Sequence, residues 1–256
     1  MNSGFAGVVL AAGAGTRLRP LSRWLPKAMC PVANRALVDH GIERISALCD
    51  QVAVNLHYGA EVLDRHLGSE IHRSFERREA LGTAGAIGAL ADWIDGRPVL
   101  VTNADGWLGP GSEEAVVALV NGWDGERYRL MCVRDETRED FDGLRYCGVS
   151  LMSWDHARRL LPQPSGLYEV AWRDALGAGR VDLFEVDVDF VDCGTASDYL
   201  SANMRANSGL SVVDPNTRIE SGAIVERSVV WGGSTVRAGE VLRDAIRTPH
   251  GTVLVR

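Results

Sequence analysis

Residues 8–27 read VVLAAGAGTRLRPLSRWLPK, and this stretch decides the fold. Its opening apolar run at 8–10 has no alternation of polar and apolar residues, which predicts a buried parallel strand. The run leads into small residues at 11–16, whose backbone can pass close to a ligand and whose N–H groups can together bind an anion. Arg17 follows at once, and Lys27 closes the stretch. A glycine-rich loop after a strand, followed by cations, indicates a site for a chain of phosphates.

Three familiar phosphate-binding patterns can be compared with this loop. The pattern G-x-x-x-x-G-K-[ST] of P-loop proteins is absent. The dinucleotide fingerprint G-x-G-x-x-G fails because Leu18 stands where its third glycine belongs. The HRD and DFG motifs that accompany a kinase glycine loop are also missing. An NAD-dependent dehydrogenase is therefore disfavoured as an alternative, and failure to bind NAD(H) would remove it.

The spacing from Gly13 to Pro26-Lys27 resembles the signature of the sugar-1-phosphate nucleotidyltransferases, the NDP-sugar pyrophosphorylases. An ordinary glycine turn after a strand is the alternative interpretation. The resemblance implies that Arg17 and Lys27 are catalytic, together with Asp105 further along the chain. It also implies that the nucleotide binds to Leu10, Ala11, Ala12, Gly13, Gly15, Thr16 and Arg17.

The composition limits the partners and the location. A chain of 256 residues suits one large α/β domain with a small appendage. Its net charge of −7 makes nucleic-acid binding improbable, although residues 17–35 hold five cations and no acid, which gives a local attraction for anions. The five cysteines have no metal-binding spacing, and there is no signal peptide or long apolar run. We therefore expect a reduced, cytoplasmic protein that binds no membrane.

Alternating strand and helix patterns predict the architecture of the first part of the chain. Amphipathic spacing at 36–49 predicts a helix, 52–56 a strand, 60–67 a second helix and 98–102 another strand. Such alternation indicates a Rossmann-like α/β fold, with a mostly parallel sheet flanked by helices. Ligands of such sheets bind beyond the carboxyl ends of the strands.

A second small-residue stretch, LGTAGAIGAL at 81–90, follows the second predicted helix. Its residues suit a tightly packed helix, and that interpretation weighs as much as a functional one. The stretch also matches the family's L-G-T-A-G-A element, which implies contact with the base and ribose through Gly82 and Thr83. Glu79 is then the nearest candidate for accepting hydrogen bonds from the edge of the base.

Two aspartates are the candidates for binding a metal. Asp105 follows the strand at 98–102, where a carboxylate lies near bound phosphates, although an Asx turn is the alternative. The family resemblance implies that it binds Mg²⁺ and that nearby Asn103 contacts the nucleotide. Residues 188–200, VDFVDCGTASDYL, match another family element, in which Asp192 would be the second metal carboxylate. Thr195 and Asp198, three positions apart in this element, are predicted to form a helix N-cap box, which gives Asp198 a structural role instead.

The sugar-phosphate half of the site departs from the family pattern. Many members carry an E-K-P element whose lysine binds the sugar phosphate, but Lys27 is the only lysine in this chain. Three arginines could supply a cation instead: Arg134, Arg138 and Arg145. We predict a sugar-phosphate site made of Lys27, Arg145, Gly148 and Glu169, the last two from matches to family positions.

The pattern changes near residue 212, where apolar residues begin to recur every six positions. One series comprises Ile224, Val230, Val236, Leu242, Thr248 and Leu254, and a second comprises Val213, Ile219, Val225 and Trp231. This period predicts a short left-handed parallel β-helix with about 18 residues per coil. We therefore divide the chain into a catalytic domain at 1–208 and a tail at 209–256. The resemblance implies that the tail packs on the domain and serves assembly, so a homo-oligomer, dimer or higher, is expected.

The resemblance implies one reaction: an NTP and a sugar-1-phosphate give an NDP-sugar and pyrophosphate with the help of Mg²⁺. The base-side residues and the tail look most like mannose-1-phosphate guanylyltransferases, which predicts GTP and a mannose-, heptose- or cyclitol-like phosphate. A UTP- or dTTP-using enzyme is one alternative. An inactive regulatory subunit that binds nucleotide sugars is another; the missing second lysine favours it, and the intact cations and aspartates argue against it.

Overall fold

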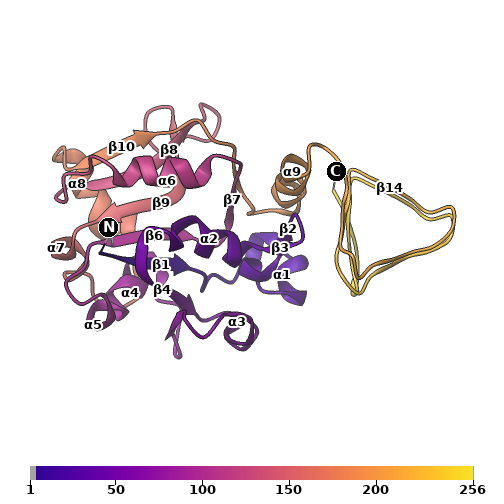
Figure 1. Ribbon diagram of the computed structural model, residues 1–256, viewed down its shortest axis with the longest axis horizontal. Coiled ribbons are helices and arrows are strands. Elements are labelled where there is room, and N and C mark those ends of the chain that lie inside the picture. The colour runs from indigo at the N-terminus through magenta and orange to yellow at the C-terminus, as the bar shows by residue number, and fades with distance from the viewer. Residues whose placement is uncertain (1–3, 256) are drawn as a thin grey trace.

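One large sheet organises the computed structural model, which describes residues 4–255, so the predicted domain limits at 1 and 256 lie outside the described residues. The sheet has seven strands and fills the larger part of the molecule (Figure 1). In spatial order these are β10 (Val181–Glu185), β8 (Tyr128–Arg134), β9 (Leu144–Met152), β6 (Val99–Asn103), β1 (Phe5–Leu10), β4 (Cys49–Leu56) and β5 (His72–Phe75).

The predicted mostly parallel sheet is confirmed, with one strand reversed. β9 runs antiparallel to both of its neighbours, β6 and β8. The other pairings, β1 with β4 and β6, β4 with β5, and β8 with β10, are all parallel. β9 is reversed because only the loop at 135–143 joins it to β8, and so short a connection returns the chain beside itself.

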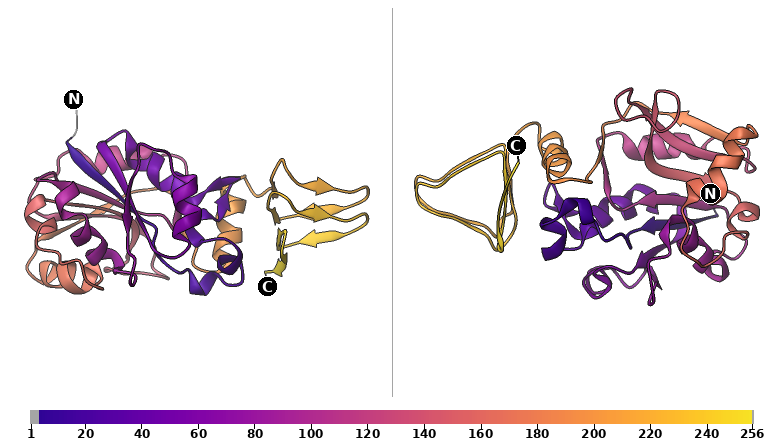
Figure 2. Two further views of the ribbon diagram at one scale, coloured as in Figure 1. Left: turned by 90° about the horizontal axis from the view of Figure 1, so that it is seen from below. Right: turned by 180° about the vertical axis from the view of Figure 1, so that it is seen from behind.

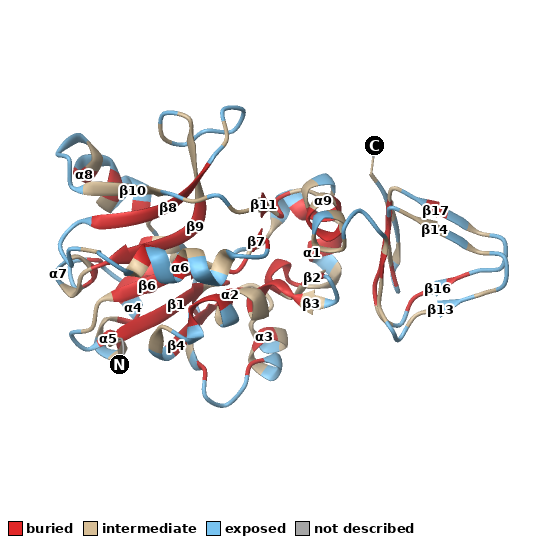
Figure 3. Cartoon of the chain, turned by 45° about the horizontal axis from the view of Figure 1, so that its top comes forward, coloured by how far each residue is buried: buried red, intermediate tan, exposed pale blue. Residues whose placement is uncertain are grey.

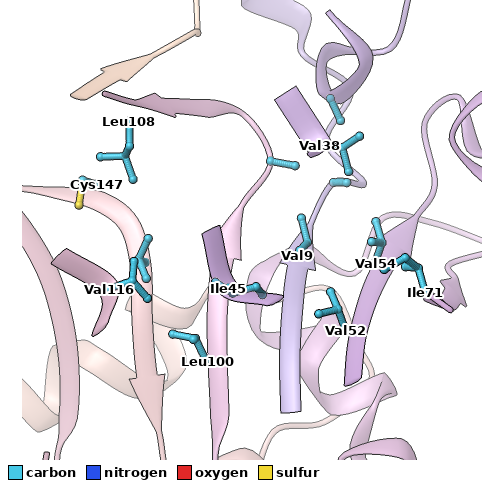
Figure 4. Packing of buried hydrophobic residues seen from close by; sticks show 14 of the residues in the cluster. Val9, Val38, Ile45, Val52, Val54, Ile71, Leu100, Leu108, Val116 and Cys147 are labelled. Atoms are coloured by element: carbon cyan, nitrogen blue, oxygen red, sulfur yellow. The ribbon is translucent and has the colours of Figure 1, made fainter. Parts of the chain in front are cut away.

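Helices cover both faces of the sheet, which explains the continuous apolar run in β1. Val9 points into one core with Val54 and with Val38 and Ile45 of α2 (Figure 4). Ala6 and Val8 of the same strand point into the opposite core. The first core receives α2 (Leu37–Ser46), α3 (Ala60–His66) and α6 (Ser112–Val120). The second receives α4 (Gly82–Ala89), α5 (Ala91–Ile94), α7 (Trp154–Ala157) and α8 (Arg173–Gly177). The central strands are accordingly buried along most of their length (Figure 3).

Short elements lie at the carboxyl edge of the sheet, where β1, β4 and β6 end. After β1 come η1 (Thr16–Leu18), α1 (Leu21–Trp24), η2 (Lys27–Met29) and the ribbon of β2 (Pro31–Val32) and β3 (Arg35–Ala36). After β6, β7 (Gly106–Leu108) pairs with β11 (Phe190–Asp192), which leads into α9 (Ala196–Ala206). Before α8 the chain forms a π-helical turn, η3 (Tyr168–Trp172). The segments after β1 and β6 bring predicted site residues to one edge.

The C-terminal segment at 212–254, here called the tail coil, winds around a triangular outline (Figure 1), and its strands stack along the axis (Figure 2). Its strands are β12 (Val212–Val213), β13 (Arg218–Ile219), β14 (Ile224–Glu226), β15 (Val229–Val230), β16 (Thr235–Val236), β17 (Val241–Arg243), β18 (Ala245–Thr248) and β19 (Gly251–Leu254). Parallel pairs join β12 to β15, β13 to β16, β14 to β17 and β15 to β18. The left-handed sense of this winding stays a prediction.

The register of the tail coil differs from the predicted one. Val212 pairs with Val229 and Ile224 with Val241, so each turn takes 17 residues rather than about 18. The missing residue falls between Val225 and Val230, which both pack in the interior of the coil. A single six-residue series through Ile224 and Leu254 is therefore wrong: both side chains are exposed, and Leu254 lies in β19, which turns back antiparallel to β18.

The tail coil packs against the segment that follows β1. Trp231 and Ile246 belong to the same buried cluster as Leu18 and Tyr199. The indole Nε1 of Trp231 donates a hydrogen bond of 2.9 Å to the Tyr199 hydroxyl, which in turn donates to the carbonyl of Pro31. The tail coil thus supports the chain on both sides of Lys27.

Candidate active site

Asp105 and Asp192 lie together because of the short antiparallel pair of β7 and β11. In its register Asp192 stands opposite Gly106, the residue directly after Asp105. The amide of Cys193 also donates a 3.1 Å hydrogen bond to the carbonyl of Asp105. Two carboxylates that are 87 positions apart in the sequence are therefore fixed side by side at the carboxyl edge of the sheet.

Lys27 lies between these two carboxylates. Its Nζ is 2.9 Å from Oδ2 of Asp105 and 3.3 Å from Oδ1 of Asp192. The lysine side chain is only 8% exposed. Burial disfavours its charged form, but the two carboxylates outweigh burial and raise the pKa of Lys27 above its usual value. The site therefore holds a fixed ammonium group at neutral pH.

Arg17 approaches the same pair from the solvent side. Its Nη2 lies 3.4 Å from Oδ2 of Asp192, and 72% of its side chain is exposed, so most of the guanidinium faces outward. Gly15 makes this arrangement possible: its φ is +58°, and a Cβ there would lie 2.8 Å from Cβ of Lys27. The glycine in the predicted phosphate loop thus allows the loop to lie directly over the lysine.

A first pocket joins the loop after β1 to these charged groups. Its lining includes predicted nucleotide and catalytic residues, namely Leu10, Ala11, Gly13, Gly15, Thr16, Arg17, Lys27 and Asp105. The amides of Gly13, Ala14 and Gly15 donate to no acceptor among residues 4–255. Free amides above a fixed ammonium group and a guanidinium suit the oxygens of a phosphate chain.

A second pocket shares Asp105 with the first, and Asp192 lines it as well. Arg145, Gly148, Asn103 and Asp140 contribute to its wall. Asn103, predicted to contact the nucleotide, lies here instead, with its side chain against Gly148. The two pockets therefore meet beside Asp105 and Asp192.

Of the three arginines considered for the missing lysine, only Arg145 lines this second pocket. Its Cζ lies 4.9 Å from the centroid of the Phe190 ring, and its Nη1 lies 3.4 Å from Oδ2 of Asp135. The side chain of Arg145 is 15% exposed. Arg134 pairs with Glu185 where β8 and β10 end, and Arg138 pairs with Asp198 at the start of α9.

The two aspartates suit a magnesium ion. Mg²⁺ in proteins commonly takes one or two carboxylates and completes its shell with water and substrate phosphate. The side chain of Asp105 is 46% exposed and that of Asp192 is 28% exposed, so oxygens of both remain accessible. Among residues 4–255 no group of three or more His, Cys, Asp or Glu side chains is arranged to hold a metal ion.

Several predicted site residues lie outside both pockets: Ala12, Glu79, Gly82, Thr83 and Glu169. Glu79 and Glu169 are exposed. The hydroxyl of Thr83 accepts a hydrogen bond of 2.8 Å from the amide of Leu167. Their contact with a ligand stays a prediction.

The glycines of α4 meet another part of the chain. A Cβ on Gly82 would lie 2.5 Å from the carbonyl oxygen of Ser165, and one on Gly85 would lie 2.1 Å from that of Gln163. The backbone at 163–165 thus occupies the space that these small residues leave. Close packing of the helix, the alternative to the functional interpretation, is therefore enough to explain these small residues.

Two buried polar residues near the site escaped the sequence analysis as functional residues. Glu76 is 4% exposed and Asn55 is 2% exposed, and they hydrogen-bond to each other between the first loop and α4. A glutamate just after a strand within a run of charged residues looks like a surface position. The sequence offers no local signal for its burial.

Comparison with known proteins identifies the family. The family model described as nucleotidyl transferase matches residues 6–141, which is more than half of the chain. The chain belongs to the nucleotidyl transferase family. The matched range includes the first loop, Lys27 and Asp105, but ends before Asp192 and the tail coil.

Two relatives are named as sugar-1-phosphate nucleotidyltransferases. N-acetylmuramate alpha-1-phosphate uridylyltransferase from Caulobacter vibrioides is 37% identical over 157 residues, 58% of this chain and 64% of its own length. Mannose-1-phosphate guanyltransferase from Pichia angusta is 37% identical over 110 residues, 39% of this chain and 30% of its length. The chain thus spans less than two thirds of the length of these curated relatives.

Solved structures share the fold. A protein titled mannose-1-phosphate geranyltransferase from Thermus thermophilus superposes with a TM-score of 0.74 at 18% identity, over 98% of this chain and 95% of that one. At this identity the likeness concerns the fold alone. Within residues 4–255, every helix is too short or too polar to span a bilayer.

Proposed function

We propose that this chain transfers a nucleotidyl group from an NTP to a sugar-1-phosphate, releasing pyrophosphate. The observation that carries the proposal is the contact of Lys27 with both Asp105 and Asp192 where the two pockets meet. An NTP in the first pocket would extend its α-phosphate toward this junction. A sugar phosphate in the second pocket would approach from the opposite side, as an in-line displacement requires.

The residues of the chain can supply most of what this reaction needs. A phosphate monoester is largely ionised at neutral pH, with a second pKa of about 6, so its oxygen attacks without a general base. Lys27 stabilises the charge that develops at the α-phosphate, and Arg17 binds the leaving pyrophosphate. The free amides of the first loop hold the phosphates in place, so that catalysis rests on positioning and charge stabilisation.

Asp105 and Asp192 would hold Mg²⁺. The ion supplies positive charge that polarises phosphoryl oxygens. The two carboxylates would fix the position of that charge. Lys27 holds the two carboxylates together when no ligand is bound.

Arg145 is proposed as the cation that replaces the missing second lysine, because it alone of the three candidate arginines lines the second pocket. Its planar guanidinium can bind two phosphate oxygens at once in a fixed fork, a geometry that a lysine lacks. Gly148, with a φ of +86°, would leave backbone accessible to the sugar beside it.

The base and the sugar are finer proposals. GTP with a mannose-like phosphate remains the first combination to test, in line with the guanylyltransferase names among the relatives. UTP is a second candidate for a specific reason: the uridylyltransferase relative matches over 157 residues, which is 58% of this chain.

The proposals for the whole chain are a catalytic domain at 1–208, a left-handed β-helical tail at 209–256 and a cytoplasmic homo-oligomer. A panel of GTP, UTP, dTTP and ATP against mannose-, N-acetylmuramate- and heptose-1-phosphates, with pyrophosphate release as readout, tests the reaction. Pyrophosphate released only when both substrates are present supports the transfer. No release from any pair, with nucleotide sugar still bound, would favour the regulatory subunit.

A further inference from the structure

A line of hydrogen bonds joins the two loops on the nucleotide side of the site. The amide of Ala11 donates to Oδ1 of Asn55 at 2.6 Å, and Nδ2 of Asn55 donates to Oε1 of Glu76 at 2.7 Å. The other carboxylate oxygen, Oε2 of Glu76, accepts from the amide of Leu81 at 2.7 Å. We call Asn55 and Glu76 the relay pair. It spans from the start of the phosphate loop to the residue before α4.

The relay pair is buried and anchored by its own backbone. Ala11, Asn55 and Glu76 are each at most 5% exposed. The amide of Glu76 donates to the carbonyl of Leu56 at 2.9 Å, and its carbonyl contacts Nδ1 of His57 at 2.7 Å. No Lys, Arg or His side chain forms an ion pair with the Glu76 carboxylate among residues 4–255, so hydrogen bonds alone hold this buried carboxylate. A buried acid retained without a counter-ion calls for a reason beyond packing.

Each hydrogen bond in the line fixes the direction of the next. The Ala11 amide can only donate, so Asn55 must present its carbonyl oxygen to it and its NH₂ group to Glu76. The Leu81 amide also only donates. Glu76 must therefore accept through both of its oxygens, which an ionised carboxylate does and a glutamine cannot do.

We propose that Asn55 and Glu76 are positioning residues that fix the spacing between the phosphate loop at 11–16 and the segment at 81–85, and so fit the site to a nucleoside triphosphate. This rests on the proposed function, in which the first loop binds the phosphates, and on the predicted contact of Gly82 and Thr83 with the base. The relay pair touches neither Asp105 nor the second pocket. Its loss should therefore weaken the nucleotide half and spare the sugar-phosphate half.

Glu76→Gln is the first test. One amide donor would then face either the Asn55 NH₂ group or the Leu81 amide, which leaves a buried donor without an acceptor. We expect KM for the preferred NTP to rise about tenfold or more, kcat to fall less, and KM for the sugar-1-phosphate to stay within about twofold. The matched control is Glu70→Gln, the same change at an exposed residue in the connection before β5, which should leave all three constants unchanged.

A double variant tests the direction of the relay. Asn55→Asp combined with Glu76→Gln keeps one carboxylate and reverses the order of the two groups. The introduced aspartate accepts from the Ala11 amide and from the NH₂ group of the introduced glutamine, whose carbonyl accepts from the Leu81 amide. This double variant should restore KM for the NTP to within about threefold of wild type. Asn55→Asp alone places two buried carboxylates together, so its KM for the NTP should be higher than that of Glu76→Gln and that of the double variant.

Hydrogen–deuterium exchange at 11–16 and 81–85 supplies a readout that does not depend on turnover. Glu76→Gln should accelerate exchange in both segments, and the double variant should slow it again. A lower Tm with unchanged KM for the NTP would overturn the positioning role, as would a double variant no better than Glu76→Gln. If the wild type releases no pyrophosphate with any substrate pair, the proposed function fails, and the exchange data still decide whether the relay couples the segments.

Discussion

Lys27 is the residue on which the geometry of the candidate site depends most. Its ammonium group lies against both aspartates, its side chain is nearly inaccessible, and Gly15 lies directly above it. A buried cation held by two carboxylates is already oriented before a substrate binds. No reorganisation of solvent is then needed as charge develops on a phosphate.

Lys27→Ala should lower kcat/KM by about 10²–10⁴-fold, as expected when a fixed charge at the reacting centre is lost. The substitution also removes the ammonium group that contacts both Asp105 and Asp192 and leaves only the exposed Arg17 beside Asp192, so the variant should gain more thermal stability from added Mg²⁺ than the wild type does. Steady-state kinetics and thermal unfolding with and without Mg²⁺ measure both effects. Activity within about threefold of wild type would sink the catalytic assignment.

Asp105→Asn and Asp192→Asn should each suppress turnover, and combining them should cost far less than the sum of the single losses. The reason is that both carboxylates serve the same ion and the same lysine. Initial rates of the two single variants and the double variant, titrated with Mg²⁺, give the coupling. Undiminished wild-type activity in EDTA would refute a shared metal site.

At the scale of elements, Thr195 and Asp198 form the start of α9. The hydroxyl of Thr195 accepts from the amide of Asp198 at 3.1 Å and donates to its carboxylate at 2.7 Å. Arg138 adds an ion pair of 3.0 Å from the loop between β8 and β9. Thr195 is thus the N-cap of α9, and the prediction that Asp198 has a structural role in this cap is confirmed. The helix is fixed next to Asp192 by its own first turn.

Asp198→Asn should destabilise the protein in a pH-dependent way. Burial alone would raise the pKa of Asp198, but hydrogen bonds from Thr195 and Arg138, together with the charge of Arg138, lower this pKa below its ordinary 3.8. A carboxyl with a depressed folded pKa stabilises the fold above its unfolded pKa, and this contribution disappears as pH falls through the folded value. Urea unfolding at pH 7 should show a loss of about 0.5–1.5 kcal/mol, typical of one weakened hydrogen bond.

The same comparison at about pH 3 should show a smaller difference, because that pH lies below the ordinary pKa of an aspartate and part of the linkage is already lost. Asp155→Asn, a change at an exposed acid in the first turn of α7 whose ion pair is local, serves as the control. An equal loss for Asp198→Asn at both pH values would show that charge contributes nothing to the cap.

The sequence predicted those elements whose cause is local. The apolar runs before the first loop and before Asn103 form β1 and β6, as predicted. The place of the glycine loop could be predicted as well, because parallel strands end at a common edge of the sheet. Glu76 could not be found in this way, since its burial depends on hydrogen bonds to two other segments. The five-residue spacing between Val225 and Val230 was missed for another reason. One residue fewer per turn still leaves apolar residues at six-residue intervals on either side of this position, so the sequence pattern looks unbroken.

At the scale of the whole molecule, the tail coil covers an apolar surface formed by earlier parts of the chain. Deleting residues 212–256 would uncover the cluster that holds Leu18, Leu21 and Tyr199, which are buried now. Light scattering should show aggregation or a changed assembly state. Activity should fall as well, because the hydrogen bond from Trp231 to Tyr199 supports the chain beside Lys27.

Ile224→Ser on the exposed outer side of the tail coil is the control for this truncation and should change neither assembly nor activity. Trp231→Phe isolates the hydrogen bond: it keeps an apolar ring, removes the donor and should cost about 1 kcal/mol of stability. A truncated chain that stays soluble, with unaltered assembly and rates, would show that the tail is dispensable.

The reversed strand β9 bears on how members of this fold could exchange specificity. One hairpin, β8 with β9, carries Asp140, Arg145 and Gly148 to the second pocket, whereas the first pocket is drawn almost wholly from residues before 106. A hairpin enters and leaves a sheet at the same end. Recombination at that end could therefore replace the tip of the hairpin alone, which would change residues of the second pocket and leave the first pocket unchanged.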